Sequence, residues 1–156
     1  MSGVSNGNTY PYVAIDLNTQ VDFCSAGGAC CVTNAESLLP NLERIIAWAR
    51  ATGTPMVSSV DSHRQCELPN GGKKKHCVDG TVGQEKLAFT ICPKRLLIQV
   101  DNTLSVPLDL FDSYEQVIFR RRGDDFFANP KADRFLSQLP VQEFVLFGNA
   151  AEEGIR

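Results

Sequence analysis

Short apolar segments alternate with helical segments along these 156 residues, and this alternation leaves few folds open. Apolar runs bounded by turn residues predict strands, whereas apolar residues spaced by three and four predict helices. The predicted strands are 12–17, 55–60, 96–100, 116–120 and 143–148. The predicted helices lie between a cap at Thr33 and Gly53, at 108–114 and at 131–139. Such repeats form an α/β fold, a doubly wound (Rossmann-like) parallel sheet flanked by helices. Ligands of these sheets bind at the carboxyl ends of the strands.

Local signals mark the ends of two of these helices. Thr33 and Glu36 have the spacing of a capping box. Gly53 is placed to end the same helix, because glycine accepts the left-handed conformation of a helix cap. Pro130 stands at a favourable first-turn position of the last predicted helix.

The composition is that of a globular protein, with 43% hydrophobic and 21% charged residues. A net charge of −3 argues against a nucleic-acid partner, and no apolar run is long enough to cross a membrane. A polar start and six cysteines, which we interpret as reduced thiols, predict a cytoplasmic protein. We expect residues 1–10 to be a disordered tail. Residues 11–156 should form a single domain, truncated at its C-terminus because the pattern stops soon after the last strand.

One stretch after the second predicted strand combines residues that bind metals. Asp61 and His63 stand two residues apart, so in an extended chain their side chains point to one side. His76 can return from a polar, glycine-containing loop as a third ligand. A carboxylate with two imidazoles suits zinc, iron or manganese. The alternative is a loop that binds no ion, since Asp-x-His is a common sequence.

The same stretch resembles the metal loop of nicotinamidases, in the isochorismatase-like cysteine hydrolase superfamily. The matching residues are VDSH at 60–63 and HCVDGTVGQE at 76–85, and the resemblance extends over residues 11–156. It implies that Asp61, His63 and His76 bind a divalent metal. A further histidine that binds the metal in the family has no counterpart here; Cys66 and Glu67 lie nearby without matching its position.

The resemblance also locates the position of the family's catalytic base. Gln20, Asp22 and Phe23 match the family's Asp-x-Gln-x-Asp-Phe motif, which puts Asn18 where the base should be. An amide cannot act as a carboxylate base. Asp16, two residues earlier, is a substitute if the strand is regular.

The other two catalytic positions are also changed. The family's lysine corresponds to Arg120 or Arg121, which keep the charge but do not readily exchange a proton. The nucleophilic cysteine corresponds to Gly154, which has no side chain. The family's oxyanion region corresponds to Asn149 and Ala150, and the resemblance implies a cis peptide bond between them.

These changes predict a hydrolase-family domain of the amidase type that keeps a divalent-metal site but is inactive as a cysteine hydrolase, a pseudoenzyme. Its ligand would be a small carboxamide-like molecule, and we expect a homo-oligomer. The alternative is an active amidohydrolase that uses a metal-bound water or a displaced thiol, Cys24 or Cys77. A third reading is an α/β chain without a site.

Overall fold

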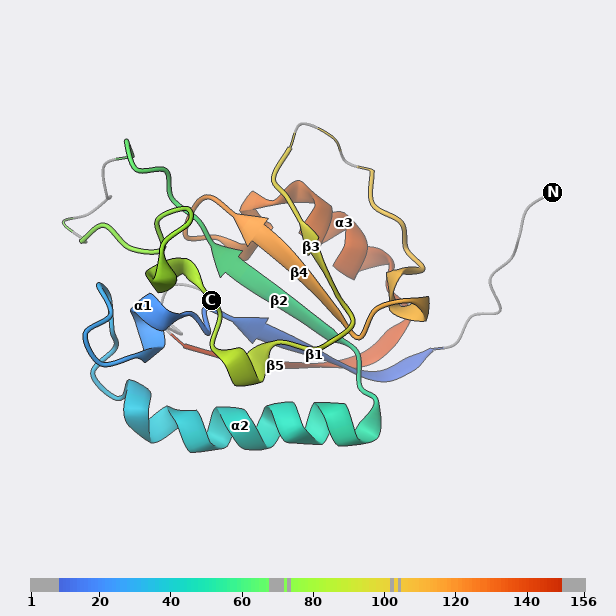
Figure 1. Ribbon diagram of the computed structural model, residues 1–156. Helices are drawn as coiled ribbons and strands as arrows, with labels where there is room; N and C mark the ends of the chain where they lie inside the picture. The colour runs from blue at the N-terminus through green and yellow to red at the C-terminus, as the bar shows by residue number, and fades with distance from the viewer. Residues whose placement is uncertain (1–8, 68–71, 73, 102, 104, 150–156) are drawn as a thin grey trace.

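The computed structural model describes residues 9–67, 72, 74–101, 103 and 105–149. Five strands form one sheet in the order β3-β4-β2-β1-β5, and every neighbouring pair is parallel (Figure 1). The strands are β1 (Tyr10–Leu17), β2 (Met56–Asp61), β3 (Arg95–Ile98), β4 (Gln116–Arg121) and β5 (Val141–Gly148). The predicted parallel α/β sheet is therefore confirmed.

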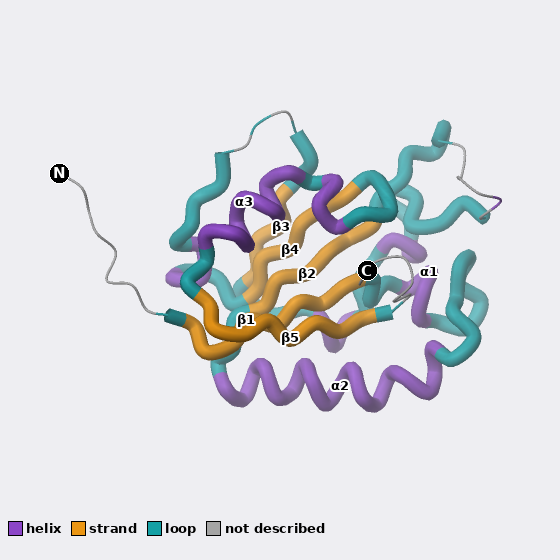
Figure 2. The backbone as a smooth tube through the Cα atoms, turned by 180° about the vertical axis from the view of Figure 1, so that it is seen from behind, coloured by secondary structure: helices purple, strands orange, loops and turns teal. Residues whose placement is uncertain are grey.

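Helices cover both faces of the sheet. The long helix α2 (Ala35–Thr52) lies along one face, and α3 (Pro130–Gln138) lies on the other, in front of the sheet in Figure 2. The short helix α1 (Val21–Cys24) follows directly after β1. Four 3-10 turns complete the description: η2 (Val82–Gln84), η3 (Ala88–Thr90), η4 (Leu110–Asp112) and η5 (Phe126–Ala128).

Alternate residues of the strands supply two separate cores. Ala14 and Met56 face α2, where they belong to one buried cluster with Leu42 and Ile46. The intervening residues of β1 face the other way and join the cluster that contains Phe135 of α3; they are Val13, Ile15 and Leu17. This alternation follows from the pleat of a strand. It leaves the strand ends as the place where polar side chains can gather.

Helix ends were predicted with mixed success. Gly53 ends α2 with a φ of 66°, in the left-handed region, as expected. Pro130 begins α3, and the side chain of Asn129 caps it by accepting a hydrogen bond from the Lys131 amide. The capping box at Thr33 is wrong: α2 begins one residue later, with Asn34 as the cap residue and no cap bond from its side chain.

Two weaker segments are shorter than predicted. The helix expected at 108–114 is the single 3-10 turn η4, and the strand expected at 96–100 is β3, which ends at Ile98. β3 lies at an edge of the sheet and pairs with β4 alone. None of the helices in the described part of the chain combines the length and hydropathy that a membrane span requires.

Candidate metal and triad-equivalent site

The parallel sheet brings the ends of distant segments to one edge. β2 ends at Asp61, which pairs in register with Arg121 at the end of β4. β1 ends at Leu17, which pairs with Gly148 at the end of β5. The polar residues at or directly after these ends therefore lie close together, although they are far apart in sequence.

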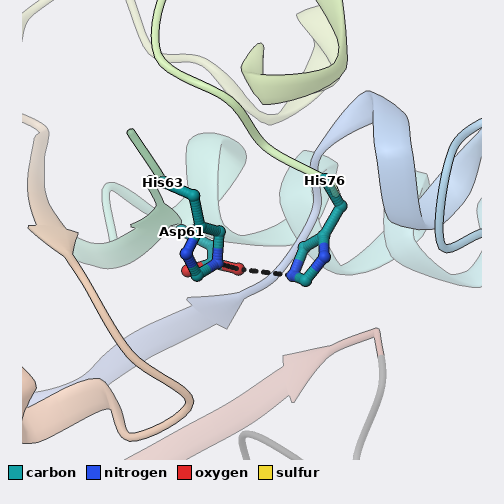
Figure 3. A group of neighbouring side chains, drawn as sticks. All are labelled: Asp61, His63 and His76. Carbon is teal, nitrogen blue, oxygen red and sulfur yellow. Dashed lines mark hydrogen bonds and ion pairs between the residues drawn. The ribbon is translucent and has the colours of Figure 1, made fainter. Parts of the chain in front are cut away.

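The three predicted metal ligands converge. One donor atom from each of Asp61, His63 and His76 lies within 4.8 Å of the other two. The Oδ2 atom of Asp61 lies 3.1 Å from Nε2 of His63 and 3.2 Å from Nε2 of His76. Figure 3 shows the two imidazoles approaching this carboxylate. Asp61 and His76 are buried, whereas His63 is partly exposed, so the group opens toward solvent on one side.

Hydrogen bonds fix the orientation of both imidazoles. Nδ1 of His76 lies 2.8 Å from the carbonyl oxygen of Lys74, and Nδ1 of His63 lies 3.3 Å from the carboxylate of Glu67. Both partners are acceptors, so each Nδ1 carries the proton. Nε2 of each ring therefore faces Asp61, and a bound ion would take the Nε2 lone pair of the neutral ring. An acceptor behind the ring is the usual arrangement of metal-binding histidines.

The carboxylate of Asp61 has an unused acceptor. Among the described residues, no hydrogen-bond partner reaches its buried Oδ1 atom, and the nearest cation is Nη1 of Arg121 at 3.5 Å. Burial alone would raise the pKa of Asp61, but contact with His76 and the charge of Arg121 outweigh it and lower the pKa. The carboxylate is therefore ionised at neutral pH. Two imidazole lone pairs beside this anion fit a divalent cation, which would satisfy all three donors together.

The loop that carries His76 is held against the end of β2. His63 forms an isolated parallel bridge with Val78: its amide donates to the Cys77 carbonyl at 3.0 Å, and its carbonyl accepts from the Asp79 amide at 2.8 Å. Cys77 adopts a φ of 47°, an uncommon left-handed conformation for a residue with a side chain. This backbone geometry returns His76 to the strand end.

Asn18 and Arg121 lie next to this group. The Arg121 guanidinium donates to the side-chain oxygen of Asn18, and both residues are buried. Asn18 in turn donates to the Asn149 carbonyl at 3.3 Å. Arg120, the other candidate for the lysine position, is only partly buried, and its main-chain carbonyl accepts from Asn129. The structure thus brings Arg121 to Asn18. Ala150, Gly154 and the predicted cis bond lie outside the described residues.

Asp16 is engaged elsewhere. Its carboxylate accepts from Nζ of Lys86 at 2.6 Å, from the Thr19 hydroxyl at 2.8 Å and from the Ser58 hydroxyl at 3.2 Å. The chain turns at Asn18, where φ is 58°, so the regular strand on which a substitute base depends does not continue. The sequence contains no sign that Lys86 is buried and pairs with Asp16, because it stands in a segment of mixed polar and apolar residues.

The two thiols considered as substitutes are buried. Burial raises the pKa of Cys24, although Asn149 donates a hydrogen bond to its sulfur. Burial also raises the pKa of Cys77, and the negative charges of Asp61 and Asp22 raise it further. Both groups are thus thiols at neutral pH, whereas nucleophilic attack requires a thiolate.

Solved structures with this fold are known, although no family model matches the sequence and no curated protein matches it. Pyrazinamidase of Pyrococcus horikoshii in complex with zinc superposes with a TM-score of 0.65 at 20% identity, covering 91% of this chain and 72% of that one. An isochorismatase-like hydrolase from Alkaliphilus metalliredigens gives 0.64 at 19%, covering 88% and 66%. PnC1 from L. infantum, in complex with nicotinate, gives 0.62 at 17%, covering 95% and 71%.

Because these identities are low, the structural similarity establishes the fold alone. The chain has the α/β fold of isochorismatase-like hydrolases, and the structures similar to it include pyrazinamidases and nicotinamidases. The similarity to these proteins thus includes the arrangement of the whole sheet as well as the metal loop.

Proposed function

We propose that this chain is a nicotinamidase-like domain that binds a divalent metal but has lost cysteine-hydrolase chemistry. The convergence of Asp61, His63 and His76 carries the proposal, because each imidazole has its Nδ1 tied to an acceptor and its Nε2 directed at one carboxylate. The zinc complex of the similar pyrazinamidase supports the same reading.

Nε2 of both histidines and the carboxylate of Asp61 would hold the ion. This donor set suits zinc, iron or manganese, and a bound ion supplies a Lewis acid that polarises a ligand. Glu67 contacts the far nitrogen of His63, so it orients the ring from behind. The partly exposed side at His63 is where a small molecule would approach.

The loss of thiol chemistry follows from three positions. Asn18 has no basic oxygen to take a proton, and the arginine at 121 does not readily exchange one. Gly154, at the position of the nucleophile, offers no atom for a covalent intermediate. Arg121 and Asn18 instead bond to each other, which leaves a neutral amide and a fixed positive charge beside the metal ligands.

A small ring-bearing molecule of the carboxamide or carboxylate type is the ligand we favour, as the nicotinate complex of the L. infantum protein suggests. The alternative of an active amidohydrolase has less support, because Asp16 is paired with Lys86 and both nearby thiols are buried. We also expect residues 11–156 to act as one domain, in a cytoplasmic homo-oligomer.

The direct test combines metal content with turnover. Protein purified without added metal should contain about one equivalent of a transition metal per chain, and His63→Ala should lose it. A matched control is Asp79→Asn, which changes a carboxylate on the same loop that pairs with Arg122. Nicotinamide should not be hydrolysed. Turnover that disappears in Cys24→Ala or Cys77→Ala would overturn the proposal.

A further inference from the structure

Gln20 is bound to the main chain of a metal ligand. Its Oε1 accepts from the Asp61 amide at 2.8 Å, and its Nε2 donates to the Asp61 carbonyl at 3.0 Å. The same Nε2 donates to the Gln84 carbonyl at 2.7 Å. The side chain is completely buried. Its amide therefore bridges the end of β2 to the chain that returns from the metal loop.

Asp22 binds the main chain beside another ligand. Its Oδ2 accepts from the amide of Cys77, the residue after His76, at 2.7 Å. Its Oδ1 accepts from the Ala29 amide at 3.0 Å. The loop also packs closely on this carboxylate: a Cβ atom at Gly83 would lie 2.2 Å from Oδ2. Only glycine fits there without displacing Asp22.

The two contacts share one origin in the chain. Gln20 and Asp22 stand at the start of α1, and they hold the two segments that carry all three metal ligands. Each reaches the site through main-chain atoms next to a ligand. The relative position of β2 and the metal loop is thus set by one turn.

We propose that Gln20 and Asp22 are positioning residues of the metal site, which bring the three donors together before an ion binds. This inference rests on the proposed metal-binding function. Outer residues that orient metal ligands typically change affinity by about 10–100-fold when they are replaced. A purely structural role would lower stability without changing affinity in the molecules that remain folded.

Gln116 provides a matched control. It is also completely buried, and its amide likewise holds main chain: Oε1 accepts from the Cys92 amide at 2.8 Å, and Nε2 donates to the Thr90 carbonyl at 2.9 Å. Gln116 begins β4, at the opposite end of the strand from Arg121. Gln20→Met and Gln116→Met thus remove equivalent bonds, near the ligands and away from them.

The experiment measures zinc affinity of the full chain by competition with a chromophoric chelator. The visible spectrum of the Co²⁺-substituted protein reports ligand geometry. Gln20→Met should weaken zinc binding by about 10–100-fold and alter the Co²⁺ spectrum. Gln116→Met should bind zinc within about twofold of wild type, because distant sites act independently. Asp22→Asn, which replaces one acceptor oxygen, is the second variant if Gln20→Met does not fold, and it should lose at least about tenfold.

Three outcomes separate this inference from the function on which it rests. If wild type binds zinc and Gln20→Met or Asp22→Asn binds it equally well, the positioning role is wrong and the metal site stands. Equal weakening by Gln116→Met would contradict the positioning role in the same way. If wild type binds neither zinc nor Co²⁺, the proposed function itself fails.

Discussion

Zinc should stabilise the folded chain by an amount that depends on His76. A ligand that binds only the native state adds about 2.7 kcal/mol at a free concentration 100 times its dissociation constant. For a chain of about this length, each kcal/mol raises the unfolding midpoint by about 2–4 °C, so zinc should raise it by about 5–11 °C. The stabilisation requires all three donors, which lie within 4.8 Å of one another.

His76→Ala removes one donor of the three. If the affinity falls about 100-fold, the same zinc concentration contributes only about 0.4 kcal/mol, and the shift falls to about 1–2 °C. The variant also loses a ring contact with Phe23, whose centroid lies 5.4 Å from that of His76, so its midpoint without metal should fall too. The quantity to compare is therefore the shift caused by zinc in each protein.

Differential scanning calorimetry with and without zinc measures these shifts. Magnesium serves as the control ion, because it prefers an octahedral shell of oxygen ligands and should produce little shift at this site. An equal zinc shift in wild type and His76→Ala would refute the reasoning, since zinc would then bind elsewhere on the chain.

Three further predictions concern the rest of the molecule. Lys86→Met should destabilise the protein by about 3–5 kcal/mol in urea unfolding, because it leaves the buried carboxylate of Asp16 without its cation; a loss below about 1 kcal/mol would contradict a buried pair. Hydrogen bonds from Lys131 and Thr103 lower the pKa of Asp101 from 3.8 to about 2, so the stability that they contribute is present above pH 3.8 and disappears as the pH falls toward 2. Asp101→Asn should therefore be less stable than wild type at pH 7, with the difference shrinking below pH 3.8; a constant difference would be evidence against the pair. Alkylation of the accessible thiols should leave zinc affinity within about twofold of its original value, and a larger loss would implicate a cysteine in the site.

The sequence predicted most of the fold because its strongest signals are local. The apolar runs gave the five strands, and Gly53 and Pro130 marked helix ends where the structure has them. The convergence of the metal ligands was also predictable. Asp61 and His63 follow a strand with the right spacing, and His76 stands in a rigidly spaced motif.

What the sequence could not give depends on contacts between distant segments. The sequence alone does not distinguish Arg120 from Arg121. The register of β2 and β4, which pairs Asp61 with Arg121, brings Arg121 to the site. Asp16 was considered a substitute base because a regular strand was assumed, whereas the left-handed turn at Asn18 interrupts that regularity. The main-chain contacts of Gln20 could not be predicted either, because they join it to Asp61 and Gln84, which are distant in sequence.

The most direct test of a retained metal site is the anomalous scattering of a crystal grown with zinc. We predict one strong peak at bonding distance, about 2.0–2.2 Å, from Nε2 of His63, Nε2 of His76 and a carboxylate oxygen of Asp61. A peak bound by other residues, or a cysteine sulfur among its ligands, would contradict the proposal of a nicotinamidase-like metal site without its thiol.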